Sequence, residues 1–331
     1  MSGKYIKSIF VFILLALTWK QLDAQLVPNL GGQRAGTAAA QFLKIGVGGR
    51  ATAMGEAFVA VANDASALYW NPAGIAQFQK NELIISHVDW FVDINHEFVG
   101  YVHHLNATNS IGVQVTSLHM EDMPVTTEFQ PRGTGEFFSF GDVLFGITYA
   151  TKFTDRFSFG GTVKYFDETL DDISMNGVLI DLGTYYWIGL GSARFAVAIT
   201  NFSLRQLKPS GEIRLLDGTL VDKFQSFNPP TLFRVAYAQE VYQNNGNSVT
   251  TSVQLNHPND NSENLNFGIE YWWRGSIALR GGYKLNVDEE SLSFGAGVNA
   301  SVGGSDLTID YSYSSFGLLG EVNRFSFKLS F

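Results

Sequence analysis

Residues 292–301 read Leu-Ser-Phe-Gly-Ala-Gly-Val-Asn-Ala-Ser, in which apolar side chains alternate with small or polar ones. Successive side chains of a β-strand point to opposite faces, so this stretch predicts a strand with one oily face and one polar face. Residues 264–273, 305–314 and 322–331 show the same alternation. Strands of this kind build either a soluble sandwich with an oily core or a membrane barrel with an oily exterior.

The whole C-terminal three quarters of the chain follows this pattern. We count about fourteen segments of roughly the ten-residue length that a tilted membrane strand requires. They are predicted at residues 82–90, 96–105, 110–119, 142–152, 156–167, 177–187, 193–202, 231–240, 248–256, 264–273, 276–285, 291–302, 305–314 and 322–331. Tyr and Trp gather near their ends, which is typical of the aromatic girdles at membrane interfaces and favours the barrel over a secreted β-rich domain.

Composition supports the same class of protein. Charged residues make up only 16% of the 331 residues and aromatic residues 14%, while the mean hydropathy is +0.03. That hydropathy is too low for a helical membrane protein but suits strands that are apolar on one face. The net charge of −9, without a basic run, argues against nucleic acid as a partner. The chain has no Cys, so disulfides and thiol chemistry are excluded.

The first residues predict a secretory signal peptide. Lys4 and Lys7 precede an apolar run at residues 9–17, and Ala24 supplies the small residue expected before a cleavage site. The run is shorter than the roughly 20 residues of a membrane-spanning helix. We therefore expect a signal peptide at residues 1–24, a plug segment at 25–81 and a β-barrel at 82–331, embedded in the lipid of a bacterial outer membrane.

The lengths of the connections give a further expectation. If both ends of the barrel chain lie on the periplasmic side, connections alternate between short inside and long outside. Two predicted outer connections, residues 120–141 and 203–230, are long and carry apolar side chains, which we predict to bind a partner or a hydrophobic substrate. These residues are Met123, Phe129, Phe137, Phe138, Leu215, Phe224 and Phe227. The alternative is that the two connections fold over the barrel mouth and pack on each other.

Residues 63–74 read Asn-Asp-Ala-Ser-Ala-Leu-Tyr-Trp-Asn-Pro-Ala-Gly and predict a short helix with a proline stop. Asp64 or Ser66 can cap its start, and Pro72 disfavours the helical conformation of the residue before it. We expect this stretch to close the lumen of the barrel. The plug motif consists of Asp64, Asn71, Pro72, Ala73 and Gly74.

No motif predicts catalysis, a metal or a cofactor. Residues 46–51, Gly-Val-Gly-Gly-Arg-Ala, match a dinucleotide-binding loop in form, but no strand precedes them. His103 and His104 are neighbours in a strand and therefore point to opposite faces. We expect the inward charges to pair across the lumen or against the plug, because buried charges need partners. These are Lys164, Asp181, Glu270, Arg280 and Asp310.

The signal peptide, the strand pattern and the motif Ala-Asn-Asp-Ala-Ser-Ala-Leu-Tyr-Trp-Asn-Pro-Ala-Gly at residues 62–74 together resemble the FadL-like outer-membrane barrels, in which Asn-Pro-Ala-Gly lies in the plug region. The lead-in at residues 42–57, Phe-Leu-Lys-Ile-Gly-Val-Gly-Gly-Arg-Ala-Thr-Ala-Met-Gly-Glu-Ala, is similar to the PorV/PorQ family of Bacteroidota-type bacteria. The resemblance does not choose between PorV-like, PorQ-like and orphan members.

Two functions follow from this resemblance. The PorV/PorQ likeness implies a component of the type IX secretion system that binds a translocon subunit or the C-terminal domains of secreted cargo. The FadL likeness implies, as the alternative, a passive transporter of long-chain fatty acids or other hydrophobic small molecules. In neither case does the resemblance imply an enzyme.

Overall fold

The computed structural model describes residues 36–214 and 219–331. The predicted signal peptide, the first part of the predicted plug segment and the predicted partner-binding residue Leu215 lie outside the described residues. Residues Gly31–Phe331 form one compact unit. Among the described residues, no helix combines the length and the apolar character that crossing a membrane demands.

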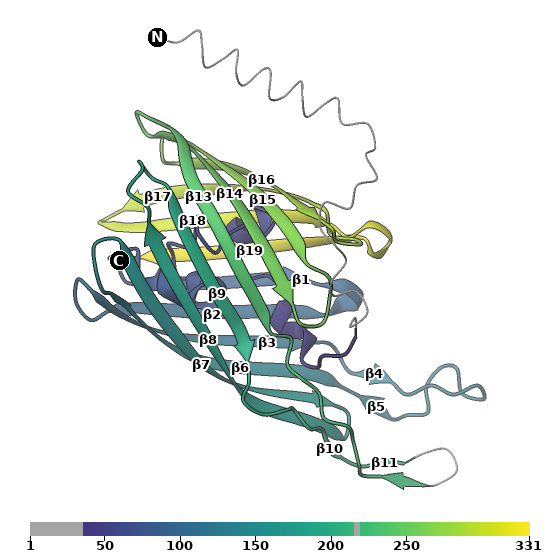
Figure 1. The fold of residues 1–331 in the computed structure, drawn as a ribbon. Helices are drawn as coiled ribbons and strands as arrows, with labels where there is room; N and C mark the ends of the chain where they lie inside the picture. The colour runs from purple at the N-terminus through teal and green to yellow at the C-terminus, as the bar shows by residue number, and fades with distance from the viewer. Residues whose placement is uncertain (1–35, 215–218) are drawn as a thin grey trace, which may run out of the picture. The chain divides into compact units, whose positions relative to one another are not determined.

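The described chain is an antiparallel β-barrel (Figure 1). The main sheet has 15 strands, of which one, β10, is a two-residue addition; the other 14 close into a ring. These are β1 (Glu82–Asp89), β2 (Asn95–His104), β3 (Asn109–His119), β6 (Phe140–Lys152), β7 (Phe157–Leu170), β8 (Ile173–Trp187), β9 (Arg194–Phe202), β13 (Leu232–Asn244), β14 (Asn247–Pro258), β15 (Asn264–Trp273), β16 (Ile277–Leu285), β17 (Leu292–Val302), β18 (Ser305–Ser315) and β19 (Glu321–Ser330). Pairing of β1 with β19, from Glu82 opposite Ser330 to Asp89 opposite Asn323, closes the ring.

This architecture confirms the predicted fold class. Each predicted segment overlaps one strand of the ring, because period-two alternation is a direct consequence of strand geometry. The largest difference lies at β7 and β8, because the predicted segments leave residues 168–176 between them. The two strands instead pair out to Leu170 opposite Ile173, and a tight turn with Asp171 at a φ of 52° joins them.

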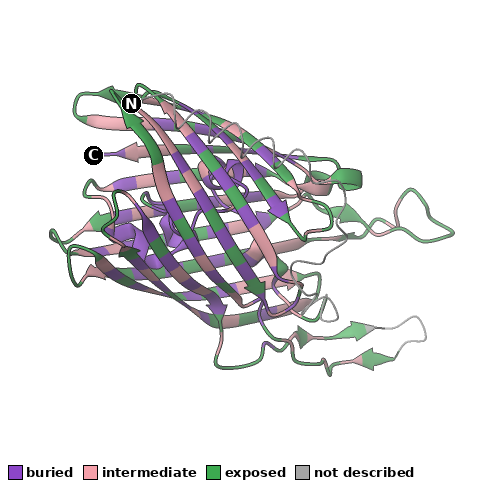
Figure 2. Cartoon of the chain, turned by 45° about the horizontal axis from the view of Figure 1, so that its top comes forward, coloured by how far each residue is buried: buried purple, intermediate pink, exposed green. Residues whose placement is uncertain are grey.

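Buried and exposed residues alternate along the strands (Figure 2). On β3, Val113 and Val115 are exposed while Gln114 and Thr116 are buried. The oily side chains thus form the outer wall and the small or polar ones face the interior. A soluble sandwich would have the opposite arrangement, so the wall is suited to lipid.

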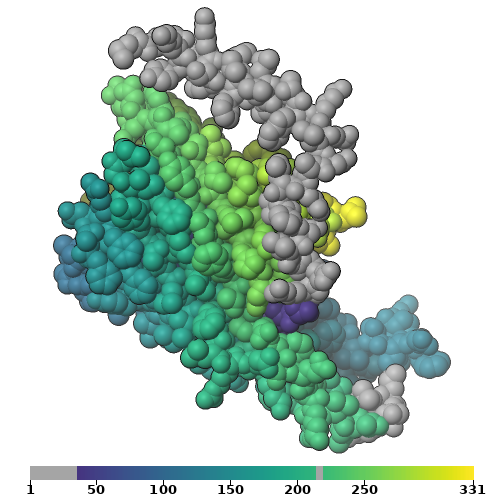
Figure 3. Space-filling view, in the orientation of Figure 1, coloured from purple at the N-terminus to yellow at the C-terminus, as the bar shows by residue number. Residues whose placement is uncertain are grey.

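The two ends of the barrel differ. At one end, which we call the turn end, the connections are residues 105–108, 153–156, 188–193, 245–246, 274–276 and 303–304. The other end, the loop end, has both long connections, residues 120–139 and 203–231. The first contains β4 (Met123–Pro124) and β5 (Phe137–Phe138), and the second β10 (Ser210–Gly211), β11 (Ile213–Arg214) and β12 (Leu220–Val221). Both project beyond the barrel (Figure 3).

Residues 36–81, the N-terminal segment, lie inside the barrel (Figure 1). Their helical turns are η2 (Gln41–Lys44), α2 (Gly49–Ala53), α3 (Ala67–Trp70) and η3 (Pro72–Ala76); η4 (Phe91–Asp93) and η5 (Gly317–Leu319) belong to loop-end connections. Inward-facing glycines make room for this segment. A Cβ on Gly268 would lie 2.6 Å from the Met54 carbonyl oxygen, and one on Gly282 would overlap the Gly55 backbone.

Candidate functional site

A charge network ties the N-terminal segment to the wall. The Arg50 guanidinium on α2 donates to both oxygens of Glu270 at 2.8 Å and to Asp64 at 2.9 Å. Glu270 also accepts from Arg280, which in turn reaches Asp310, both at 2.7 Å. The inward charges predicted from the sequence therefore do pair, and Arg50 joins them to the segment inside the barrel.

These pairings set the charge states of the segment. Burial alone would lower the pKa of Arg50, but Glu270 and Asp64 raise it above its ordinary value. Burial would likewise raise the pKa of the Asp64 carboxyl, but the positive charges of Lys328 and Arg50 lower it below its usual range. Both groups are held in their charged forms.

The predicted plug motif packs against the wall of the barrel. Asp64 accepts from the Ser66 amide at 3.1 Å and hydroxyl at 2.5 Å, and α3 begins at the next residue. Asn71 donates to the carbonyls of Val59 and Thr184 at 3.0 and 3.1 Å and accepts from the Ala73 amide at 3.1 Å.

The other motif residues allow close backbone approach. A Cβ on Gly74 would lie 2.5 Å from the Ala62 carbonyl oxygen, so a larger residue does not fit there. Pro72 and Ala73 lie against Gly160 and Gly183 of the wall, where the missing side chains let the two backbones meet. The motif thus acts through backbone contacts, and its role in closing the lumen stays a prediction.

An apolar cluster lies inside the loop end of the barrel; we call it the apolar sector. Inward-facing side chains of four adjacent strands pack on residues of the N-terminal segment, with the rings of Phe42 and Phe166 6.1 Å apart. Its buried members are Ala40, Phe42, Leu43, Ile45, Leu118, Leu144, Phe166, Met175, Leu179 and Leu207. Leu207 comes from the long connection after β9, not from a strand of the ring.

The wall has a seam beside this sector, at residues 175–179 of β8. β8 pairs with β9 only from Ile180 onward, and β10 pairs with β8 only at Ile173 and Ser174. At Asn201, whose φ is 60°, a bulge turns β9 away from β8. Within residues 36–214 and 219–331, no strand therefore pairs with the edge of β8 at residues 175–179 on that side.

A cluster of three buried polar side chains fixes the position of the bulge. The Asp181 carboxylate accepts from the Asn201 amide at 2.7 Å and forms an ion pair with Lys164. Lys164 also donates to the Asn201 side chain at 3.1 Å. Because all three side chains are buried, this arrangement would be costly to break.

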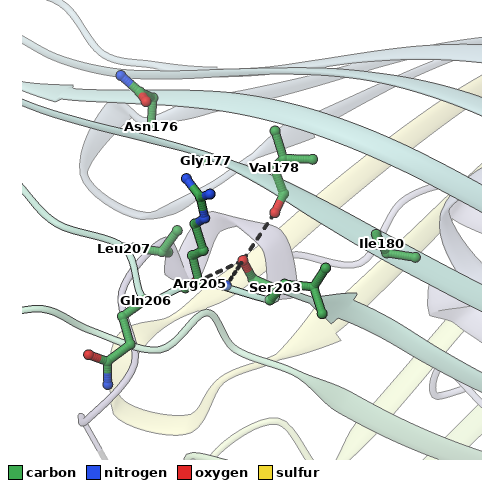
Figure 4. A pocket seen from close by; sticks show the side chains of 9 residues that line it. Asn176, Gly177, Val178, Ile180, Ser203, Arg205, Gln206 and Leu207 are labelled. Carbon is green, nitrogen blue, oxygen red and sulfur yellow. Dashed lines mark hydrogen bonds between the residues drawn. The ribbon is translucent and has the colours of Figure 1, made fainter.

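Residues 203–209, the cover segment, run across the seam in place of a strand (Figure 4). The Ser203 hydroxyl lies 3.1 Å from the Val178 carbonyl oxygen and 2.8 Å from the Arg205 carbonyl oxygen, and either can accept its one proton. Gly177 gives Leu207 its space, since a Cβ there would lie 2.6 Å from the Leu207 side chain and 3.0 Å from Phe166.

A pocket of about 410 Å³ lies between the cover segment and the outer side of β8 (Figure 4). It is lined by Asn176, Gly177, Val178, Ile180, Ser203, Leu204, Arg205, Gln206 and Leu207. Among the described residues, Leu207 is the member that this pocket shares with the apolar sector. Leu207 therefore contacts both the apolar sector inside the barrel and the pocket on its outer wall.

The opposite side of the loop-end mouth is polar and contains a second pocket, of about 170 Å³. It is lined by Lys44, Glu56, Leu232, Arg234, Asn256, Pro258, Asn261, Asn264, Asn266, Lys284, Val287 and Glu290. Lys44 pairs with Asp260 at 2.9 Å, and Lys284 pairs with Glu56 at 3.0 Å and with Glu290. We call this half of the mouth the polar sector.

The predicted partner-binding residues divide into two groups. Met123, Phe129 and Phe137 on the first long connection are exposed, with 94% of Phe129 accessible. Phe138, Phe224 and Phe227 are half-buried. Phe227 exchanges two backbone hydrogen bonds with Leu207, at 2.7 and 2.8 Å, so the second long connection braces the cover segment.

The sequence did not identify Asn201 and Gly177, which form the seam, or Arg234, a cation of the polar sector. Asn201 carries a signal, because Asn is one of the few residues that tolerate positive φ. Gly177 and Arg234 carry none, because their roles depend on neighbours that only the closed barrel brings together.

Comparisons with known proteins bear on the fold. A family model described as "Uncharacterised protein family (UPF0164)" matches residues 29–165. No curated protein matches the chain. Among solved structures, the toluene transporter TbuX of Ralstonia pickettii is similar at a TM-score of 0.55 and 13% identity, over 86% of this chain and 97% of that one.

Three further structures show the same likeness. The CymD monoaromatic hydrocarbon channel aligns at a TM-score of 0.56 and 12% identity, over 86% of this chain and 97% of that one. The toluene transporter TodX of Pseudomonas putida aligns at 0.54 and 12%, over 85% and 96%. A FadL homologue of Pseudomonas aeruginosa is also similar, at a TM-score of 0.50. The chain therefore has the fold of the FadL-like outer-membrane barrels.

Proposed function

We propose that this chain is a passive transporter of hydrophobic small molecules in the bacterial outer membrane. The loop end faces the outside of the cell, the apolar sector takes up the molecule, and the seam releases it sideways into the lipid. The observation that carries this proposal is the position of Leu207, which lies in the apolar sector and also lines the pocket on the outer wall. The toluene transporters and the monoaromatic hydrocarbon channel among the similar structures support it.

The remainder of the lumen favours the sideways route. The N-terminal segment fills the barrel below the apolar sector, where Val47, Ala51, Met54 and Phe58 are fully buried. An apolar molecule gains about 25 cal/mol for each Å² of its surface that leaves water, so the apolar sector attracts it. From there, displacement of Leu207 opens a shorter path than displacement of the whole segment.

A reversible cross-link tests the seam. Ser174 of β8 and Ser210 of β10 are directly opposite, with hydroxyl oxygens 3.2 Å apart, and the natural chain has no Cys. Oxidised Ser174→Cys/Ser210→Cys protein should fix the cover segment and stop toluene uptake by cells, and a reductant should restore it. Uptake that is equally fast in the oxidised and reduced states would overturn the sideways route.

A substitution provides the second arm. Leu207→Trp should block the seam and slow toluene uptake, because the larger ring fills the passage. Leu190→Trp, at an exposed site of the turn end, is the matched control and should transport normally. Both proteins must show the heat-dependent gel mobility of a folded barrel.

The second candidate function is a partner-binding component of protein secretion, of the PorV/PorQ type in the type IX secretion system. It is supported by the exposed aromatic side chains of the first long connection, Phe129 and Phe137, which no other described part of the chain covers. Affinity purification of the tagged protein from its own outer membrane should recover a large translocon subunit or exported proteins with a C-terminal sorting domain. If neither kind of protein is recovered, this candidate function is excluded.

A further inference from the structure

The polar sector contains a buried cation without a counter-charge. Arg234 on β13 is 4% exposed, and no described residue forms an ion pair with it. Its guanidinium lies 5.2 Å from the ring centre of Trp70 and 6.0 Å from that of Tyr69. One Nη atom of Arg234 makes no hydrogen bond.

The other charges of this pocket are compensated. Lys44 is paired with Asp260, and Lys284 with Glu56 and Glu290, while Arg324 approaches Glu290 at 3.9 Å. Of the residues that line the pocket, Lys44, Arg234 and Lys284 carry a positive charge and Glu56 and Glu290 a negative charge. The uncompensated charge is that of Arg234, so the polar sector has the charge to accept one monovalent anion.

A second buried group in the same pocket is also unsatisfied. Asn266 on β15 is 1% exposed, and its amide oxygen has no hydrogen-bond partner. Asn256, directly opposite Arg234 on the neighbouring strand, donates to Asn264 at 2.6 Å, and Asn264 is two residues from Asn266 on β15. The pocket thus offers one charged donor on β13 and one acceptor on β15.

We propose that the polar sector binds a small organic monoanion that carries hydroxyl groups, in the class of the sugar acids. The carboxylate accepts from the free edge of the Arg234 guanidinium, a charge-assisted contact whose planar geometry suits a carboxylate. A hydroxyl donates to the Asn266 amide oxygen. The pocket is lined mainly by amides and charged groups, so it suits a hydroxylated molecule and not a hydrocarbon.

This proposal is independent of the seam. It uses β13–β16 and the N-terminal segment, whereas release through the wall uses β8, β9 and the cover segment. The experiments can therefore distinguish two outcomes. One is a hydrocarbon transporter that lacks a sugar-acid site, and the other is a barrel that has this site but releases nothing through its wall.

The experiment measures gluconate binding to the full-length protein in detergent by equilibrium dialysis. We expect saturable binding of gluconate and none of sorbitol, its uncharged counterpart. Arg234→Gln should weaken gluconate binding by about tenfold or more, as expected for loss of a charged hydrogen bond. Arg274→Gln, which removes an exposed arginine at the turn end and changes net charge equally, should bind as the natural protein does.

Two further arms separate the proposal from its rivals. Asn266→Ala should weaken gluconate but not acetate, which has no hydroxyl group to donate. If glucose 6-phosphate displaces gluconate as well as unlabelled gluconate does, the pocket is a phosphate site. That result would overturn the assignment to a carboxylate. Equal gluconate binding by Arg234→Gln protein would show that Arg234 serves only to stack on Trp70, and would also overturn it.

Discussion

At the scale of single residues, Asn71 connects three separate parts of the fold. Its amide group bonds to Val59 in the N-terminal segment, to Thr184 in the wall and to Ala73 in the next turn. All three partners are backbone groups, and Asn71 itself is fully buried. Such groups lose their bonds to water on burial, so each one left without a partner destabilises the protein.

Replacement of Asn71 should therefore loosen the N-terminal segment. Asn71→Ala should lower the free energy of unfolding by about 3 kcal/mol and raise the leakage of small antibiotics into cells. Gln79→Ala, at an exposed position of the same segment, is the control and should change both far less. Unchanged leakage in a folded, inserted Asn71→Ala barrel would show that closure depends on other contacts.

The lowered pKa of Asp64 predicts how the stability of the native state changes with pH. Its carboxyl has a pKa below the ordinary value of 3.8, so the native state holds it ionised more strongly than the unfolded state does. The resulting stability is fully present above that value and is lost as the pH falls below it. Leakage should rise in acid below about pH 4, and Asp64→Asn protein should leak at neutral pH with a weaker dependence on acid.

At the scale of elements, the seam results from a conflict between two strands. β8 continues to Ile173 because it pairs with β7 from Tyr186 to Ile173, whereas β9 ends at Phe202, one residue beyond the bulge. The cover segment then supplies a few hydrogen bonds where a strand would supply a ladder. This part of the wall is therefore the easiest to open, because local stability follows the number of such contacts.

The conformation of Asn201 should control the seam. Glycine adopts positive φ without strain, whereas a β-branched residue resists it. Asn201→Gly should keep the seam and transport toluene, while Asn201→Val should straighten β9, extend its pairing with β8 and reduce uptake. If both variants fold and transport equally well, the bulge does not set the opening.

The strands could be predicted from the sequence, and the seam could not. The alternation at residues 292–301 depends only on neighbours along the chain, so it specifies β17 and its outward face directly. The bulge at Asn201 depends instead on Asp181 and Lys164, which the closed barrel brings together. The missing partner of Arg234 is hidden for the same reason, since pairing across the lumen follows from the register of the whole ring.

At the scale of the whole molecule, the two proposed functions use different parts of the chain. Transport uses the apolar sector, the seam and the second long connection, which braces the cover segment through Phe227 and Leu207. Docking in secretion uses the exposed side chains of the first long connection. Removal of the second connection would therefore disturb transport, whereas removal of the first would disturb docking and leave transport intact.

Replacement of residues 122–138 by a short Gly-Ser linker should leave the barrel intact. β4 and β5 pair only with each other, and β3 pairs with β6 from His119 opposite Gly141, so the ring keeps its hydrogen bonds. Toluene uptake should stay at the natural rate, while recovery of a translocon subunit or of sorting-domain cargo should be lost. A shortened barrel that still recovers those partners would place the docking surface elsewhere, and one that loses toluene uptake would show that this connection also serves the mouth.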